Sequence, residues 1–297
     1  MTNVLKAALA LTLCVGAGAA LAGCSGSGDQ TKASSVELPT KNRAQWVLPL
    51  DQYMPANWDP EFYAENALAQ PCMTKAGYDW NPPAQTIDPP TGESWNAAGR
   101  KLFNADLAAK YGYSNSPMTI MPAAEKAADD AFVQEAGSLG QSGGEQLKTC
   151  ILAARKVTGW KEDPTSYAQD LRLSAQQSDS DRTRVSAAAK KWAACMKPLG
   201  IADLPSSPPK MPSDSVAADT SDTPNRAVSD TERSIAVHDA KCRETSGWAA
   251  AEYRAEWNAE VPLLEKNADT LQRYLAVSKK QRERALKIIA DHPLTQG

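Results

Sequence analysis

The chain has 297 residues, a net charge of −3 and a hydrophobic content of 42%. Nucleic-acid binding depends on basic contacts to phosphate, so a mildly acidic chain argues against a nucleic-acid partner. This length can fill one large domain or two small ones. Only three Phe stand beside eight Trp and eight Tyr, and Ala is abundant. This composition favours a mainly α-helical fold in which helices pack closely through small side chains.

The N-terminus has the pattern of an export signal. Residues 1–23 contain one charge, Lys6, followed by a run of Ala, Leu, Val and Gly that is too short for a stable membrane span. The segment Leu21-Ala22-Gly23-Cys24 resembles the bacterial lipobox, in which the cysteine receives a diacylglycerol and a peptidase cuts just before it. The resemblance implies a signal peptide over 1–23 and lipid on Cys24, which would hold the protein on the extracytoplasmic face of the cell membrane.

A Ser-Gly tract follows the proposed lipid site directly, at residues 25–28. Such tracts behave as flexible spacers, and we place a flexible tether at 24–45. The alternatives are an ordinary signal peptide with an incidental cysteine, and a buried N-terminal helix.

Four cysteines are left when Cys14 of the signal and Cys24 are set aside: Cys72, Cys150, Cys195 and Cys242. An even number in an exported chain predicts two disulfides, for which three pairings exist. The first and third are each followed by Met, three further residues and Gly, whereas the second and fourth each precede a Gly-Trp pair. This order suggests an internal duplication and favours the pairs Cys72–Cys150 and Cys195–Cys242. A chance similarity is the alternative.

We therefore predict two disulfide-linked helical halves, 46–170 and 171–297. Apolar spacing and terminal Pro or Gly signals place the cysteines on helices. The C-terminal half should end in a long helix, whose apolar seam begins at Trp257 and is interrupted at Pro262 by a kink or a new helix start. The helices that carry cysteines are expected at about 59–72, 145–157, 185–199 and from Ser234 onward.

Three stretches are predicted to be irregular. The proline-rich segment 80–90 cannot be helical. The glycines between Gly137 and Gly144 precede a helix without the strand and lysine of a phosphate-binding loop, so we interpret them as a linker. The segment 204–225, rich in Pro, Ser and Asp, is predicted to be mobile.

The chain resembles a group of uncharacterised secreted lipoproteins of actinobacteria. The resemblance rests on the lipobox, on the segment Trp-x-x-Cys-Met-x-x-x-Gly at 192–200, on the segment 235–242 and on a long C-terminal helix with an early Trp. It covers residues 185–290 best and 65–155 more loosely, and His238 departs from the Ala that is usual there. The resemblance implies location, disulfides and a helical fold. It implies no activity.

Few residues point to catalysis. His238 and His292 are the only histidines, and no His, Cys and carboxylate cluster has zinc spacing, so we predict neither a metal nor a cofactor. His238 and Cys242 could form an imidazole–thiolate pair, but a disulfide cysteine beside an incidental histidine is the favoured interpretation. No nucleophile elbow, P-loop or dinucleotide fingerprint occurs. Acid pairs such as Asp129-Asp130 are adjacent and cannot face each other across a glycosidic bond.

Two features suggest binding. Basic residues cluster near the end of the C-terminal helix and could contact anionic lipid or wall polymer, although a solvated helix end is the simpler interpretation. Aromatic residues after the first cysteine (Trp80, Trp95, Tyr111 and Tyr113) could hold sugars, although core packing is favoured. The basic residues are Lys279, Lys280, Arg282, Arg284 and Lys287.

The sequence thus predicts a non-catalytic binding or accessory module of the cell envelope, with wall polymer or an envelope protein as a possible partner besides the membrane. One alternative is a solute-capturing lipoprotein that serves a transporter, although the chain lacks the alternating strand–helix pattern of two-lobed binding proteins. The other is a cell-wall hydrolase, which would need a buried carboxylate with a shifted pKa in a cleft.

Overall fold

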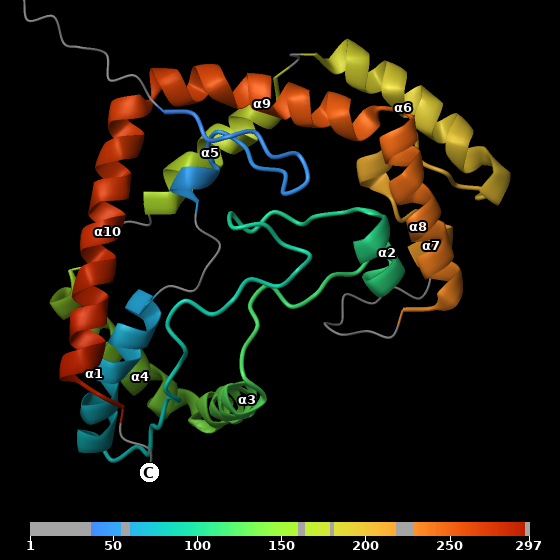
Figure 1. The fold of residues 1–297 in the computed structure, drawn as a ribbon. Coiled ribbons are helices and arrows are strands. Elements are labelled where there is room, and N and C mark those ends of the chain that lie inside the picture. Colours follow the sequence, from blue (N-terminus) through green and yellow to red (C-terminus); the bar gives the residue numbers. More distant parts are fainter. Residues whose placement is uncertain (1–36, 55–59, 160–163, 179–180, 218–227, 295–297) are drawn as a thin grey trace, which may run out of the picture. The chain divides into compact units, whose positions relative to one another are not determined.

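Helices dominate the part of the chain that the structure describes. The computed structural model describes residues 37–54, 60–159, 164–178, 181–217 and 228–294. Within these ranges the β-structure is limited to isolated bridges, so the predicted mainly helical fold is confirmed. The predicted signal peptide, 1–23, and the predicted lipid site, Cys24, lie outside the described residues. The helices are α1 (Pro60–Lys75), α2 (Ala105–Tyr111), α3 (Ala123–Ser138), α4 (Gly140–Thr158), α5 (Pro164–Gln176), α6 (Arg182–Met196), α7 (Asp214–Ala217), α8 (Asp230–Thr245), α9 (Trp248–Lys266) and α10 (Ala268–Asp291) (Figure 1).

Each disulfide joins two helices. Cys72 of α1 is bonded to Cys150 of α4, and Cys195 of α6 is bonded to Cys242 of α8, with Cα–Cα distances of 5.8 and 5.7 Å. The predicted pairing is confirmed. In the chain-entropy model, loops of this length stabilise the fold by roughly 4 kcal/mol each.

The two Cys-Met-x-x-x-Gly segments fold in the same way. In both, the cysteine lies in the last turns of a helix and the following methionine, Met73 or Met196, is fully buried. The glycines, Gly77 and Gly200, have φ values of +88° and +64°. This left-handed conformation suits glycine and ends the helical segment. The repeated sequence motif therefore corresponds to a repeated local structure.

Contacts cross the predicted boundary at residue 170. Helix α10 packs against α1 and α4, α2 packs against α8, and α5 packs against α9 and α10. Leu50 and Tyr53 share a hydrophobic cluster with Leu264 and Leu271. The predicted halves 46–170 and 171–297 therefore do not pack independently, because the last helix covers the first disulfide-linked pair. Residues from Ser34 onward form one compact unit.

The C-terminal helical region is interrupted at Asn267 rather than at Pro262. Helix α9 continues through Pro262 to Lys266, and α10 then runs in a different direction (Figure 1). The Asn267 amide nitrogen donates to the Leu263 carbonyl at 2.7 Å, and its amide oxygen accepts a hydrogen bond from Tyr167. These side-chain bonds hold Asn267 at φ −110° and ψ 13° and separate the two helices. The predicted long C-terminal helix, whose seam begins at Trp257, is therefore divided between the second part of α9 and the 24 residues of α10.

One of the three predicted irregular stretches differs from the expectation. Residues 137–144 are not a linker, because α3 reaches Ser138 and α4 begins at Gly140. Gly143 is a packing residue: a Cβ there would lie 2.8 Å from the Leu139 Cβ and 3.0 Å from the Tyr78 ring. Segment 80–90 is non-helical, as predicted.

The described part of the second proline-rich segment, 204–217, is irregular apart from short helical turns, and it packs against the helices. Pro208 is buried, and Met211 belongs to the cluster between α6 and α8. The Asp203 carboxylate accepts hydrogen bonds from Ser213 and Ser215, which joins the two ends of this part of the segment. Residues 218–225 lie outside the described ranges.

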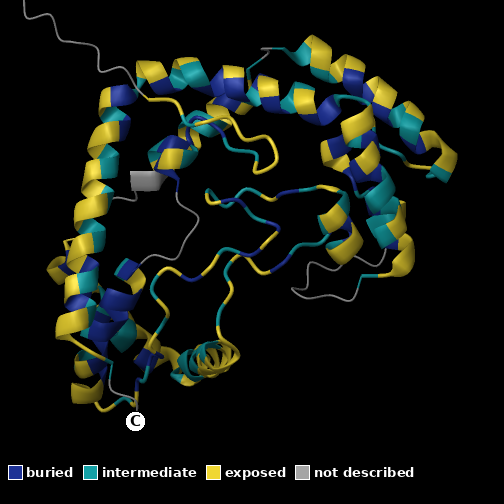
Figure 2. Cartoon of the chain, in the orientation of Figure 1, coloured by how far each residue is buried: buried dark blue, intermediate teal, exposed yellow. Residues whose placement is uncertain are grey.

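Buried residues form several clusters between neighbouring helices (Figure 2). None of the described helices has the length and apolar character that crossing a bilayer requires.

The N-terminal segment that enters the described fold is attached to α8 and α9. The Asn42 backbone N–H donates to the Tyr253 hydroxyl at 3.1 Å, and Tyr253 in turn donates to the Val47 carbonyl at 2.8 Å. Arg43 forms an ion pair with Glu244 at 2.7 Å. The last residues of the predicted tether, 42–45, thus belong to the folded body.

Candidate functional site

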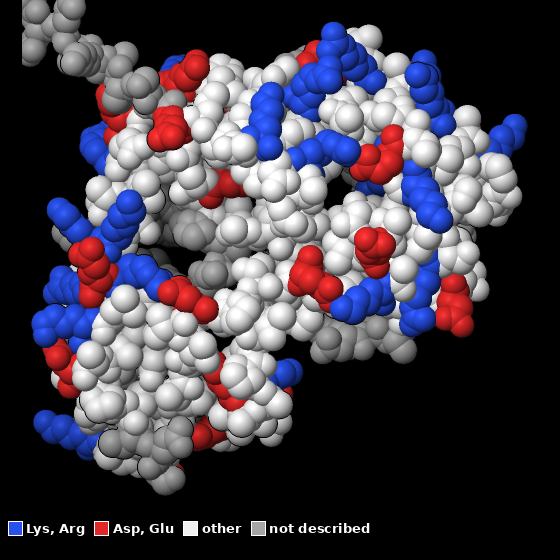
Figure 3. Space-filling view, in the orientation of Figure 1, with Lys and Arg blue, Asp and Glu red and all other residues white. Residues whose placement is uncertain are grey.

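The five basic residues predicted as a contact surface lie on the outer side of α10. The opposite side of this helix is buried through Leu271, Ala285 and Ile288. In Figure 3, basic side chains line the left edge of the molecule with acidic side chains among them. Four of the five are exposed (Lys279, Lys280, Arg284 and Lys287), and Arg282 is half-buried.

Acidic neighbours compensate part of this positive charge. Arg282 forms an ion pair with Asp88 at 2.5 Å, and Lys287 forms one with Asp291 at 2.6 Å. The Lys287 ammonium lowers the pKa of Asp291. The first role of Arg282 is therefore to fasten the proline-rich segment to α10. The residues best placed to meet an external anion are Lys279, Lys280 and Arg284.

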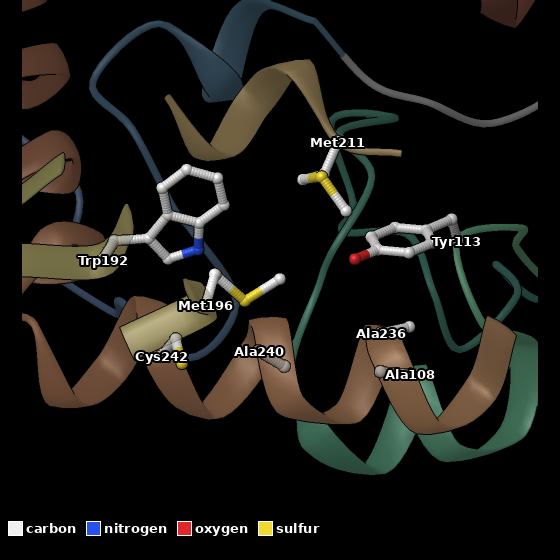
Figure 4. Packing of buried hydrophobic residues seen from close by; sticks show 8 residues of the cluster. All are labelled: Ala108, Tyr113, Trp192, Met196, Met211, Ala236, Ala240 and Cys242. Atoms are coloured by element: carbon white, nitrogen blue, oxygen red, sulfur yellow. The ribbon is translucent and has the colours of Figure 1, made fainter. Parts of the chain in front are cut away.

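A buried carboxylate, Asp239, lies between α6 and α8. It is fully buried and accepts four hydrogen bonds. The Trp192 indole donates at 2.7 Å and the Tyr113 hydroxyl at 3.2 Å, while Arg243 donates through Nε at 2.9 Å and through Nη2 at 2.7 Å. Figure 4 shows the Trp192 nitrogen and the Tyr113 oxygen pointing into the same interior space from opposite sides.

The side chains that donate to Asp239 are themselves fixed by further interactions. The Arg243 guanidinium lies over the Phe103 ring, 4.4 Å from its centroid, and donates to the Pro208 carbonyl at 2.7 Å. Burial and the Asp239 charge raise the pKa of Tyr113, so its hydroxyl stays protonated and can donate. This network joins α6 and α8 to Phe103 before α2, to Tyr113 after α2 and to Pro208 before α7.

A second buried carboxylate, Glu260 of α9, meets Arg172 of α5. Arg172 Nε donates to Glu260 Oε1 at 2.9 Å, and the other end of the guanidinium forms an ion pair with Asp51. Glu260 also accepts the Leu50 backbone N–H at 2.8 Å. Burial raises the pKa of Glu260, and Arg172 opposes this effect. The cluster joins α5 and α9 to the N-terminal segment.

Two further acids, Glu256 and Glu252, precede Glu260 on α9. Glu256 accepts the Trp46 indole N–H at 2.6 Å and forms an ion pair with Arg100 at 3.3 Å. Glu252 forms an ion pair with Arg182 at 3.3 Å. Burial and the neighbouring Glu256 charge raise the pKa of Glu252, while Arg182 lowers it. Acids at every fourth position share one face of a helix.

The arrangement of these interior acids is suited to joining segments. Asp239, Glu260, Glu256 and Glu252 each face an arginine, and the groups that complete their contacts are main-chain N–H groups and aromatic donors. Sequence reasoning missed all four. The spacing of the acids at 252, 256 and 260 was a usable signal, but a solvated helix face has the same spacing.

The structure brings together three potential metal ligands that sequence spacing did not reveal. Ligand atoms of Cys195, His238 and Cys242 lie within 4.8 Å of one another. Spacing identified only the His238 and Cys242 pair, because Cys195 lies on a different helix. The cysteines are bonded to each other here, as the favoured interpretation expected.

The four aromatic residues that could hold sugars do not share one surface. Trp80 is buried beside Met73 and Cys150, whereas Tyr113 is buried beside Asp239. The Trp95 indole donates to the Ser116 carbonyl at 2.9 Å, and the Tyr111 hydroxyl donates to Glu93. Core and loop packing accounts for these residues.

Comparison with protein-family models, curated proteins and solved structures gives no significant match for this chain.

Proposed function

We propose that the protein is a lipid-anchored helical domain on the extracytoplasmic face of the cell membrane, where it serves as a non-catalytic binding or accessory module. The observation that carries the proposal is the Leu-Ala-Gly-Cys segment at 21–24 after a short apolar run. The two interhelical disulfides support it, because disulfides form and persist mainly in oxidising compartments.

The interior charges favour binding over hydrolysis. A hydrolase would need carboxylates that reach a substrate, whereas the arginines and N–H groups around Asp239 and Glu260 already occupy these carboxylates. The exposed basic residues of α10 are the surface we assign to anionic lipid or wall polymer. Lipid on Cys24 would keep the folded domain near the membrane.

Cys24→Ser should abolish lipid attachment. The serine oxygen cannot replace the thiol in the lipid-transfer reaction, so a fatty-acid analogue fed to the cells should label the wild type only. The variant should be found uncut or in the medium rather than in the membrane fraction. Lys32→Ser, a substitution in the same segment, serves as the control and should label like the wild type. Equal labelling of Cys24→Ser would refute the anchor.

Replacing Lys279, Lys280 and Arg284 together by Gln should weaken the binding of a lipid-free chain, beginning at Ser34, to anionic vesicles by roughly a hundredfold at low salt. The attraction is electrostatic, so binding of the unsubstituted chain should fall as salt shortens the screening length. Co-sedimentation at two salt concentrations measures both effects.

The matched control removes the same charge from another helix. Arg184, Lys190 and Lys191 of α6 are also exposed, and their replacement by Gln should weaken binding much less. If both triple variants sediment alike, the charge of α10 has no special role. If no chain sediments, anionic lipid is not the ligand, and the same comparison with purified cell wall tests the polymer.

A further inference from the structure

The second disulfide differs from the first in having a histidine beside it. His238 lies one turn before Cys242 on α8, and a ring nitrogen lies within 4.8 Å of both cysteine sulfurs. The His238 Nε2 is 3.0 Å from the Cys195 carbonyl oxygen. A carbonyl only accepts, so in the neutral ring Nε2 carries the hydrogen and Nδ1 keeps its lone pair. Within the described ranges, the Cys72–Cys150 pair belongs to no such group.

We propose that reduction of the Cys195–Cys242 disulfide creates a zinc site formed by Cys195, Cys242 and His238. A dithiol reductant supplies two electrons and two protons, so that the S–S bond breaks, two thiols form and the dithiol becomes a disulfide. Zn²⁺ then displaces the two thiol protons and binds two thiolates and one imidazole. Two cysteines and one histidine are a known zinc ligand set that leaves a fourth position for water.

The backbone geometry allows a zinc ion bound by both sulfurs to replace the disulfide bond. Zinc–sulfur bonds of about 2.3 Å in a tetrahedral site place the two sulfurs about 3.8 Å apart. The Cα–Cα distance is 5.7 Å, so side-chain rotation can supply this separation. Cys195 and His238 are half-buried, whereas Cys242 is buried, so a reductant and an ion can approach from the Cys195 side.

The helices that carry the ligands do not depend on the disulfide alone. The Trp192 indole of α6 donates to Asp239 of α8, and Met196 packs in the same cluster as Ala236 and Ala240. These contacts keep the two thiols adjacent after reduction. The His238 bond to the Cys195 carbonyl orients the ring in the same way, since a second hydrogen bond commonly orients a metal-binding histidine.

The experiment uses the full-length chain, reduced by a phosphine without oxygen and titrated with Co²⁺ as a spectroscopic probe for Zn²⁺. Cys14 and Cys24 are replaced by serine in every variant, so that in a Cys72→Ser/Cys150→Ser background only the proposed site keeps its thiols. This chain should bind one Co²⁺, with a thiolate-to-cobalt charge-transfer band and the d–d bands of a tetrahedral ion, and Zn²⁺ should displace it. The same chain with the disulfide intact should bind none.

Two variants decide the assignment. His238→Ala in this background should weaken Co²⁺ binding at least tenfold, and the reciprocal Cys195→Ser/Cys242→Ser chain, which keeps the other thiol pair, should bind at least a hundredfold more weakly. Circular dichroism of each reduced chain measures its helix content. If the Cys72→Ser/Cys150→Ser chain loses helix, the effect of His238→Ala on Co²⁺ binding is measured instead in the reduced chain that keeps all four disulfide cysteines. Equal affinity with and without His238, or equal affinity of the two thiol pairs, would overturn the proposal.

Discussion

Asp239→Ala should lower the free energy of unfolding by about 3–5 kcal/mol, because it leaves a buried guanidinium without its carboxylate. Asp239 is fully buried and the Arg243 side chain is 14% exposed, so solvent screens this pair weakly. The indole of Trp192 and the hydroxyl of Tyr113 also lose their acceptor. Denaturant unfolding with the disulfides intact measures the loss.

A matched control lies on the same helix. Asp230 is fully exposed and forms an ion pair with Arg233 at 3.0 Å, so Asp230→Ala should leave the unfolding midpoint nearly unchanged. Asp239→Asn keeps an acceptor oxygen for Trp192 and should fall between the two. Similar midpoints for Asp239→Ala and Asp230→Ala would show that the buried network contributes little to stability.

Arg172→Met should destabilise the fold by a similar amount, about 3–5 kcal/mol near neutral pH. Methionine keeps much of the side-chain volume but leaves the buried Glu260 and Asp51 carboxylates without their shared cation. The α5 helix would lose its polar connection to α9 and to the N-terminal segment. The exposed Arg184 of α6 provides the control, and Arg184→Met should leave the midpoint nearly unchanged.

The loss of stability caused by Arg172→Met should depend on pH. Burial already raises the pKa of Glu260 above its usual 4.5, and loss of Arg172 removes an opposing influence and raises this pKa further. The folded variant therefore binds a proton more tightly than the unfolded chain. Its free energy of unfolding should rise relative to the wild type as pH falls from about 7.5 toward 5. A deficit that is constant over this interval would show that Glu260 does not feel the charge of Arg172.

The disulfide pairing and the main helices could be predicted because their signals are local. The residues around Cys72 and Cys195 repeat within a few positions, and the structure gives both copies the same buried methionine and left-handed glycine. Ser229 illustrates a local signal that was missed. Its side chain accepts the Glu232 backbone N–H and starts α8 at Asp230, four residues before the predicted Ser234.

The interior charge network could not be predicted, because its partners are far apart along the chain. Arg172 is 88 residues from Glu260 and 121 from Asp51. Each acid alone looks like an ordinary surface residue. No new helix begins at Pro262, because α9 continues through it to Lys266, whereas the bond between Tyr167 and Asn267 helps to fix the break at Asn267.

The attachment of the N-terminal segment to α9 has a consequence for biosynthesis. Leu50 and Trp46 find their partners, Glu260 and Glu256, 210 residues further along the chain. A ribosome that adds about 5–20 residues per second needs roughly 10–40 s to reach them. During this interval the early segment has no α9 to bind, and α1 still lacks the covering helix α10. The early segment therefore exposes its apolar surface until the last helices have been made, and a chaperone can bind it throughout that interval.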